Sequence, residues 1–184
     1  MRFSRNIIAS ILLVTAGLFP LAVQSETDQI LLDSLGEAAT LEQAQPIITA
    51  LWDAWTNNHQ DDDEKALMQD GIDAMQTGKL RQAEKIFGNL INRNPEFTEA
   101  WNKRATVRFM MSEFEASKDD VFEVLKREPR HFGAISGLGM IGFRTGDLNA
   151  ALNSYKKLQR IFPASPEAKR YIPILMEQLK LMEL

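Results

Sequence analysis

Apolar residues recur every three or four positions along most of the chain, and short polar turns interrupt them at regular intervals. This spacing is typical of amphipathic helices, because residues three and four apart share one face of a helix. The pattern predicts helices over residues 28–39 and 43–57, pairs of helices between 64 and 165, and a last helix from 166 towards 180.

A period of 34 residues relates the central part of the chain to itself, and seven columns agree at that period. Pro95, Pro129 and Pro163 share one column. The other columns are Leu67, Trp101 and Ile135; Gly71, Ala105 and Gly139; Gly78, Ser112 and Gly146; Leu80, Phe114 and Leu148; Ala83, Ser117 and Ala151; and Phe87, Val121 and Tyr155.

Each column has a mechanical interpretation. Two helices pack closely only where small residues occupy their crossing point, and the Gly or Ser column supplies the tight turn between them. The proline column ends the second helix, because proline lacks the N–H group that the helix needs. One hairpin cannot bury its apolar face alone, so three hairpins are expected to stack around a shared core.

This pattern resembles the tetratricopeptide repeat (TPR), a helix-turn-helix unit, with repeats at residues 64–97, 98–131 and 132–165. The resemblance implies an all-α fold, a right-handed α-solenoid of three TPR helical hairpins with N- and C-terminal capping helices. Residues 101–106 and 128–134 also resemble a group of exported proteobacterial TPR proteins of undetermined function. That second resemblance implies a compartment and a fold, and it implies no activity.

The flanks of the repeats are expected to cap the solenoid. Residues 26–63 are interpreted as an N-terminal helical cap and acidic linker, and Trp52 and Trp55 mark its apolar face. The alternative is that this helix docks a partner. Residues 166–184 form the predicted C-terminal cap, with Ser165 as N-cap and a kink or restart expected at Pro173.

The first residues have the pattern of an export signal. Arg2 and Arg5 precede an apolar run over residues 7–23, which is the order of a charged and then an apolar region. We expect a signal peptide over residues 1–25, cleaved after Ser25, and a periplasmic or otherwise exported protein. The alternative is an uncleaved segment that anchors the protein in the membrane through residues 7–23.

Composition excludes several classes of function. The chain has no cysteine and two histidines, so it offers no thiol chemistry and little material for metal or acid-base chemistry. A formal charge of -4 argues against nucleic-acid binding, which depends on clustered Lys and Arg. No catalytic residues, metal site or cofactor are predicted, and an enzyme is the least supported class.

Four local features receive structural interpretations. The acidic residues 61–64 fit a solvated helix start better than a calcium loop. Arg104 and Asp120 are expected to pair between the two helices of repeat two. His131 is assigned a structural loop role, with pH sensing as the alternative. Gly137 and Gly139 do not follow a predicted strand, so they do not predict a phosphate site.

The surface that the resemblance marks for binding is the concave side, which the first helix of each repeat lines. Carrying over the inward-pointing positions gives a predicted site of Met68, Ile72, Met75, Gln76, Asn102, Phe109, Met110, Met140, Phe143 and Arg144. Methionine adapts to irregular partners and suits tolerant apolar recognition. The alternative is that these side chains fill the interior and capping helices cover them.

The sequence therefore favours an exported TPR adaptor or scaffold that mediates protein–protein or peptide binding in the cell envelope through a Met/Phe-rich concave groove. Its partner is a protein or peptide of unspecified identity. The alternative is a structural or self-associating envelope protein with the groove filled internally. Self-association would then use the helix of Trp52 and Trp55 or an end of the solenoid.

Overall fold

A computed structural model describes residues 19–57 and 61–182 of the chain, and every regular element in these ranges is a helix. Most of the predicted signal segment, residues 1–18, lies outside the described residues. The helices are α1 (Phe19–Glu37), α2 (Leu41–Asn57), α3 (Asp62–Gln76), α4 (Leu80–Arg93), α5 (Thr98–Met110), α6 (Phe114–Arg127), α7 (Phe132–Thr145), α8 (Leu148–Ile161) and α9 (Pro166–Met182). None of these described helices is both long and apolar enough to span a bilayer.

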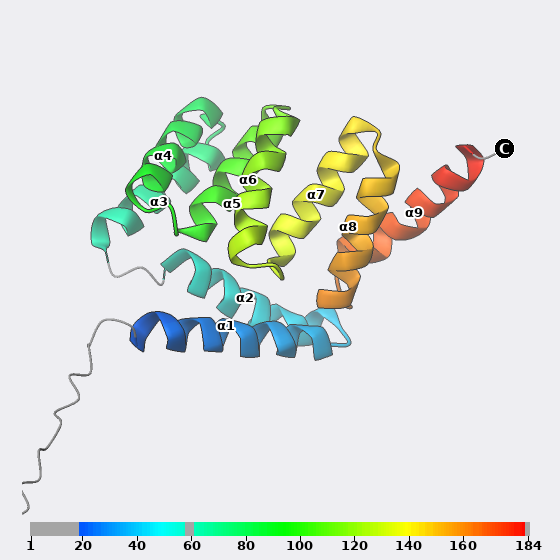
Figure 1. The fold of residues 1–184 in the computed structure, drawn as a ribbon, viewed down its shortest axis with the longest axis horizontal. Coiled ribbons are helices and arrows are strands. Elements are labelled where there is room, and N and C mark those ends of the chain that lie inside the picture. Colours follow the sequence, from blue (N-terminus) through cyan, green and yellow to red (C-terminus); the bar gives the residue numbers. More distant parts are fainter. Residues whose placement is uncertain (1–18, 58–60, 183–184) are drawn as a thin grey trace, which may run out of the picture.

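Helices α3 to α8 form three hairpins, α3–α4, α5–α6 and α7–α8, which stack side by side in sequence order (Figure 1). The predicted all-α solenoid of three helical hairpins is confirmed. The helix α9 packs against α8 and follows the last hairpin, as a C-terminal helix was expected to do. Ser165 caps it, because its Oγ accepts a hydrogen bond from the Ala168 amide at 3.2 Å.

Small and large columns of the repeat meet where the two helices of a hairpin cross. A Cβ added to Gly71 would lie 2.5 Å from the Phe87 ring, and one added to Gly139 would lie 2.8 Å from the Tyr155 ring. Both distances are far below van der Waals contact. These glycines are therefore required by the aromatic rings packed against them.

The turn column also has a physical cause. Gly78, Ser112 and Gly146 adopt φ angles of 72°, 63° and 83°, which is the left-handed region. Glycine adopts this conformation without the steric cost that a Cβ brings, and the third residue is a short polar one. The Gly/Ser column therefore ends each first helix at the same point of its hairpin.

The N-terminal hairpin α1–α2 takes a different position from the predicted end cap. It runs across one edge of the stacked hairpins, below α3 to α8 in Figure 1. Leu35 and Leu51 share a buried core with Phe132 and Tyr155, so the hairpin packs mainly on repeat three. The sequence pattern does not indicate this position, because Leu35 and Leu51 lie outside the 34-residue period.

Of the two alternatives predicted at Pro173, a kink or a restart, the restart does not occur. The helix α9 continues through Pro173 as one uninterrupted element. Proline removes one helical hydrogen bond, to the carbonyl four residues earlier. Pro173 and Lys169 are both exposed, so water can satisfy the carbonyl that is left without a donor.

The crossing contact yields a stability prediction. We expect Gly139→Ala to lower the free energy of unfolding by about 1–3 kcal/mol, because the new methyl group collides with the Tyr155 ring. Urea denaturation followed by circular dichroism measures this. As a control, Gly88→Ala places a Cβ 3.6 Å from Arg104 and is expected to stabilise by about 0.5–1 kcal/mol. Equal effects of the two substitutions would contradict the packing argument.

Candidate functional site

Two adjoining hollows lie on the inner side of the solenoid, and together they form what we call the groove. The first, the socket, has a volume of about 180 Å³ and lies between α5 and α7, with Ser117 and Val121 of α6 also lining it. The second, the cleft, has a volume of about 560 Å³ and lies between α2 and the same two helices. The hollows adjoin, because both are lined by Asn102, Thr106, Gly133 and Ser136.

Small side chains on neighbouring hairpins create the socket. Ala105 of α5 and Ala134 and Gly137 of α7 leave space that larger residues would fill, and Phe109 and Met140 form its apolar sides. Packing does not require glycine at position 137. A Cβ there would lie 3.8 Å from Val121, which is ordinary contact. Because glycine inside a helix costs about 0.5–1 kcal/mol relative to alanine, Gly137 preserves space at the expense of stability.

The cleft has one wall that does not come from the repeats. Leu41, Gln45, Ile48 and Trp52 of α2 face the repeat helices across it. This wall stands close to α7, because a Cβ on Gly133 would lie 2.7 Å from the Trp52 ring. The hairpin α1–α2 therefore narrows the concave side and leaves the groove open.

A buried polar cluster supports the floor of the cleft. The carboxylate of Glu99, fully buried, accepts hydrogen bonds from Lys103 Nζ at 2.9 Å and from Asn102 Nδ2 at 3.1 Å. His131 Nδ1 accepts the Ala134 amide at 3.1 Å, so the proton of the neutral imidazole lies on Nε2. That Nε2 donates to Glu99 at 3.2 Å.

The same cluster attaches the N-terminal hairpin. The ring of Trp55 stacks on the imidazole of His131 at 4.1 Å between centroids, and Trp52 meets the same imidazole edge-on at 5.7 Å. Lys103 Nζ lies 5.0 Å from the centroid of the Trp52 ring. His131 has the structural role that the sequence predicts, as the N-cap of α7. Its acid partner Glu99 was missed, because that residue lies 32 positions earlier.

Electrostatics of this cluster favour the charged carboxylate. Burial alone raises the pKa of Glu99, but the hydrogen bond from His131 and the positive charge of Lys103 outweigh that effect. The pKa of Glu99 therefore lies below its ordinary value.

Repeat one contributes none of its four predicted site residues to the groove. Met68 is only 1% exposed and packs in a core with Phe87 and Leu90, so the prediction that it lines the concave surface is corrected. Ile72 and Met75 are partly buried against the same core. Gln76 is exposed at the end of α3, away from both hollows.

The other predicted residues divide into two groups. Asn102, Phe109 and Met140 line the groove. The guanidinium of Arg144 lies 5.7 Å from the Phe109 ring, at the rim. Phe143 does not line either hollow, because its ring packs at 5.4 Å from that of Tyr171 in α9.

Met110 is 51% exposed and lies outside both hollows. The groove residues that the sequence analysis missed are Ala105, Ala134 and Gly137, together with the wall on α2. The sequence analysis gave Ala105 only the role of a small residue where two helices cross. No local sequence pattern indicates where α2 packs.

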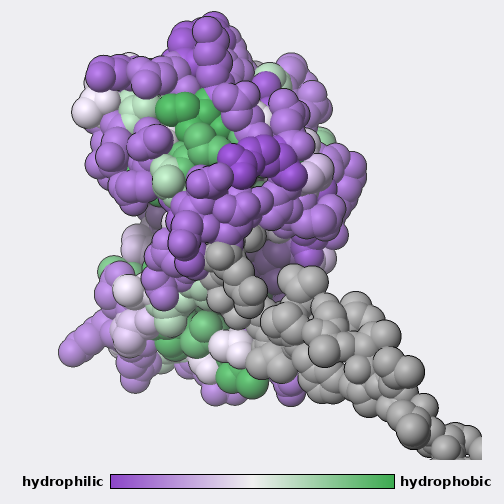
Figure 2. All heavy atoms as spheres, turned by 90° about the vertical axis from the view of Figure 1, so that its left-hand side faces the viewer, coloured by the Kyte–Doolittle hydropathy of each residue, from purple (hydrophilic) through white to green (hydrophobic). Residues whose placement is uncertain are grey.

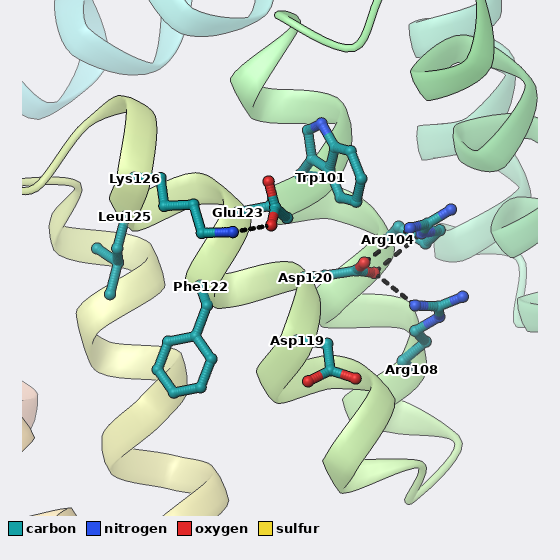
Figure 3. A pocket seen from close by; sticks show the side chains of 9 residues that line it. All are labelled: Trp101, Arg104, Arg108, Asp119, Asp120, Phe122, Glu123, Leu125 and Lys126. Atoms are coloured by element: carbon teal, nitrogen blue, oxygen red, sulfur yellow. Dashed lines mark hydrogen bonds and ion pairs between the residues drawn. The ribbon is translucent and has the colours of Figure 1, made fainter.

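A larger hollow of about 770 Å³ lies over α5 and α6 on the outer side (Figure 3). Most of its charges are paired with one another. Arg104 donates two hydrogen bonds to Asp120, at 2.9 and 2.7 Å, and Arg108 adds one at 3.0 Å. The predicted pair of Arg104 and Asp120 is confirmed, and this network is structural.

The acidic start of α3 is also structural, because Asp61 accepts the Asp63 amide at 2.9 Å as its N-cap. Among the described residues, no group of three or more Asp, Glu or His side chains is placed to hold a metal ion.

The depressed pKa of Glu99 yields a pH prediction. Its contribution to stability is fully present above the unfolded value of 4.5 and is lost as the pH falls through the lower folded value. We expect the free energy of unfolding to decline below pH 4.5. The decline should be smaller in Glu99→Gln, which cannot titrate. Urea titrations between pH 3 and pH 7 test this, and identical pH profiles for the two proteins would refute it.

Comparisons with known proteins agree with this architecture. No protein-family model matches the chain. A TPR repeat-containing protein of Rhizobium etli is 34% identical over 113 residues, which is 61% of this chain and 55% of that relative. The match thus spans about half the length of the relative.

Solved structures of TPR domains superimpose well at low identity. The first TPR of Spaghetti (RPAP3) bound to an HSP90 peptide has a TM-score of 0.62 at 19% identity, covering 64% of this chain and 93% of that one. The Yersinia enterocolitica chaperone SycD, in complex with a peptide of the translocator YopD, has a TM-score of 0.60 at 16% identity, covering 68% and 98%. MamA has a TM-score of 0.61 at 21% identity and covers 86% of each chain. The three stacked hairpins of this chain thus have the fold of a tetratricopeptide repeat solenoid.

Proposed function

We propose that this protein is a non-enzymatic adaptor that binds an extended apolar segment of a protein or peptide partner in the groove. The observation that carries the proposal is the socket beside Gly137, which stays open although a side chain would fit there. A protein that needed only a stable solenoid would gain by filling this space. The open socket is therefore suited to receive a side chain from outside.

The chemistry of the groove indicates the kind of ligand. Phe109, Val121 and Met140 offer an apolar environment for one inserted side chain. Asn102 and Ser136 lie where the socket meets the cleft, so they can hydrogen-bond to the ligand backbone. The amide nitrogen of Asn102 already donates to Glu99, which leaves its carbonyl oxygen to accept from a peptide N–H.

Charge in the groove argues against a ligand that binds mainly through carboxylates. Lys103 is the lysine that lines the cleft, and its ammonium group is engaged with Glu99 at 2.9 Å. Arg144 at the rim is exposed and is suited to contact an acidic group that flanks the apolar anchor. We therefore expect an apolar anchor residue with polar neighbours.

Peptide complexes of structural neighbours support this class of function. The TPR of Spaghetti was solved with an HSP90 peptide, and SycD with a YopD peptide. At the identities found, these neighbours share the fold with this chain. Peptide binding is consistent with that fold, and the ligand follows from the residues of this groove.

The proposed site of action is outside the cytoplasm. This part of the proposal rests on Arg2, Arg5 and the apolar run over residues 7–23, which predict an export signal. Mass spectrometry of the protein recovered from its host is expected to show an N-terminus at Glu26. A protein that keeps residues 1–25 and remains in the cytoplasm would refute it.

The socket is tested by filling it. An array of peptides with varied central residues identifies the best binder, whose dissociation constant is then measured by fluorescence anisotropy. Gly137→Leu is expected to weaken binding about tenfold or more, because burying one apolar side chain is worth about 1.5–3 kcal/mol. Gly137→Ala should have an intermediate effect.

Gly88→Ala is the matched control, because it places the same methyl group on a helix outside the groove, where contacts also allow it. Its binding should equal that of the wild type, and circular dichroism confirms that each variant is folded. Failure of every apolar peptide to bind, or normal binding by Gly137→Leu, would overturn the proposal.

A further inference from the structure

Charge is distributed unevenly along the solenoid. Residues 148–182 contain six basic and two acidic residues, whereas residues 26–147 contain 13 basic and 22 acidic residues. The C-terminal part of an acidic protein is therefore positive. All six basic residues belong to the last two helices: Lys156, Lys157, Arg160, Lys169, Arg170 and Lys180.

These cations differ from the others in their partners. Among the described residues, none of the six forms an ion pair, whereas ten of the 13 basic residues between 61 and 147 do so. Lys169, Arg170 and Lys180 are exposed on α9. Unpaired like charges repel one another, so an anionic partner would relieve this repulsion.

The helix α9 also exposes apolar side chains. Ile174 and Met176 are 40% and 53% exposed, and Leu181 and Met182 are more exposed still. A terminal helix of a solenoid normally has a polar outer face, because its apolar face would otherwise contact water. We define the C-terminal face as the exposed side of α9 with these apolar residues and its three cations.

The opposite end of the solenoid has the complementary features. The outer side of α3 exposes Asp62, Asp63, Asp70 and Asp73. Asp70 and Asp73 line a hollow of about 360 Å³ between α3 and α4, whose other lining residues are Ala74, Thr77, Lys79, Gln82 and Ile86. We call this the N-terminal face. Figure 2 looks onto this end and shows an apolar area surrounded by hydrophilic residues.

The N-terminal face is open because α1–α2 packs elsewhere. That hairpin crosses the edge of the repeats and is held at repeat three, so the aspartates of α3 remain exposed. Lys79 contributes one positive charge to the hollow and the two aspartates contribute two negative charges, so the net charge of the hollow is negative. An open solenoid end is a surface on which another unit can stack.

We propose that the C-terminal face of one copy of this chain docks on the N-terminal face of a second copy. The two faces lie at opposite ends of the solenoid (Figure 1). They combine the cations of α9 with the carboxylates of α3, and the exposed apolar side chains of α9 with Ala74 and Ile86, the two apolar residues of the hollow. The contact is heterologous, since each face meets the other kind, so copies add head to tail. This association does not use the groove.

A second copy fits the observations better than other anionic partners. An anionic lipid surface would satisfy the cations and apolar residues of α9, and it would leave the hollow at α3 without a role. A second copy accounts for both ends at once. It also explains why the acidic and basic residues are segregated along one chain.

Sedimentation velocity tests the proposal. The protein is expressed from its full coding sequence and purified as the host processes it, with or without residues 1–25. At low salt, species larger than a monomer should grow with protein concentration, and high salt should dissociate them. Two double variants reverse one face each: Lys169→Glu with Arg170→Glu, and Asp70→Lys with Asp73→Lys. Each alone should raise the dissociation constant about tenfold or more.

An equimolar mixture of the two double variants should associate again, because the reversed faces are complementary to each other. Arg144→Glu is the control, since Arg144 lies outside both faces and forms no ion pair with any described residue; this variant should leave association unchanged. Three outcomes would overturn the proposal. The wild type could remain a monomer at every protein and salt concentration, both double variants could associate as tightly as the wild type, or the mixture of the two variants could remain monomeric.

A membrane arm completes the experiment. Vesicles of phosphatidylcholine with one quarter phosphatidylglycerol are sedimented with the wild type and with the Lys169→Glu, Arg170→Glu variant. Vesicle binding by a protein that stays monomeric, lost in that variant, would assign the C-terminal face to lipid and overturn docking between copies. Association in the absence of vesicles, with rescue in the mixture, supports it.

Discussion

The structure depends on the close contact between a small residue and a large apolar side chain where the two helices of a hairpin cross. Gly71 against Phe87 and Gly139 against Tyr155 bring the two helices of a hairpin together. Close hairpins bury their apolar faces and can stack. Stacking then places α5 and α7 next to each other, and the groove is the space that remains between them.

The repeats could be predicted from sequence because their determinants are local and recur at one period. The glycine turns, the proline stops and the small columns each act within a few residues of their own position. The position of α1–α2 could not be predicted in this way. Its attachment depends on Trp55 meeting His131, residues far apart in sequence that belong to no shared pattern.

The candidate site was partly predictable for the same reason. Asn102, Phe109 and Met140 were identified because inward-pointing positions recur in each repeat. Met68 follows the same rule and fails, because it is enclosed by the core between α3 and α4. Gly137 was not recognised as a groove residue because its contribution is the absence of a side chain, whereas a sequence pattern identifies sites by the side chains that are present.

The wall that α2 contributes to the cleft has a consequence for how such a protein could change. The repeats supply the floor, whereas Ile48 and Trp52 supply one side from outside the repeat array. Leu41 and Gln45 also belong to this wall, and they are exposed, whereas Leu35 and Leu51 of the same hairpin are buried in the core shared with repeat three. Substitutions at the exposed positions would therefore reshape one side of the cleft without disturbing that shared core, so the wall can diversify on an unchanged scaffold.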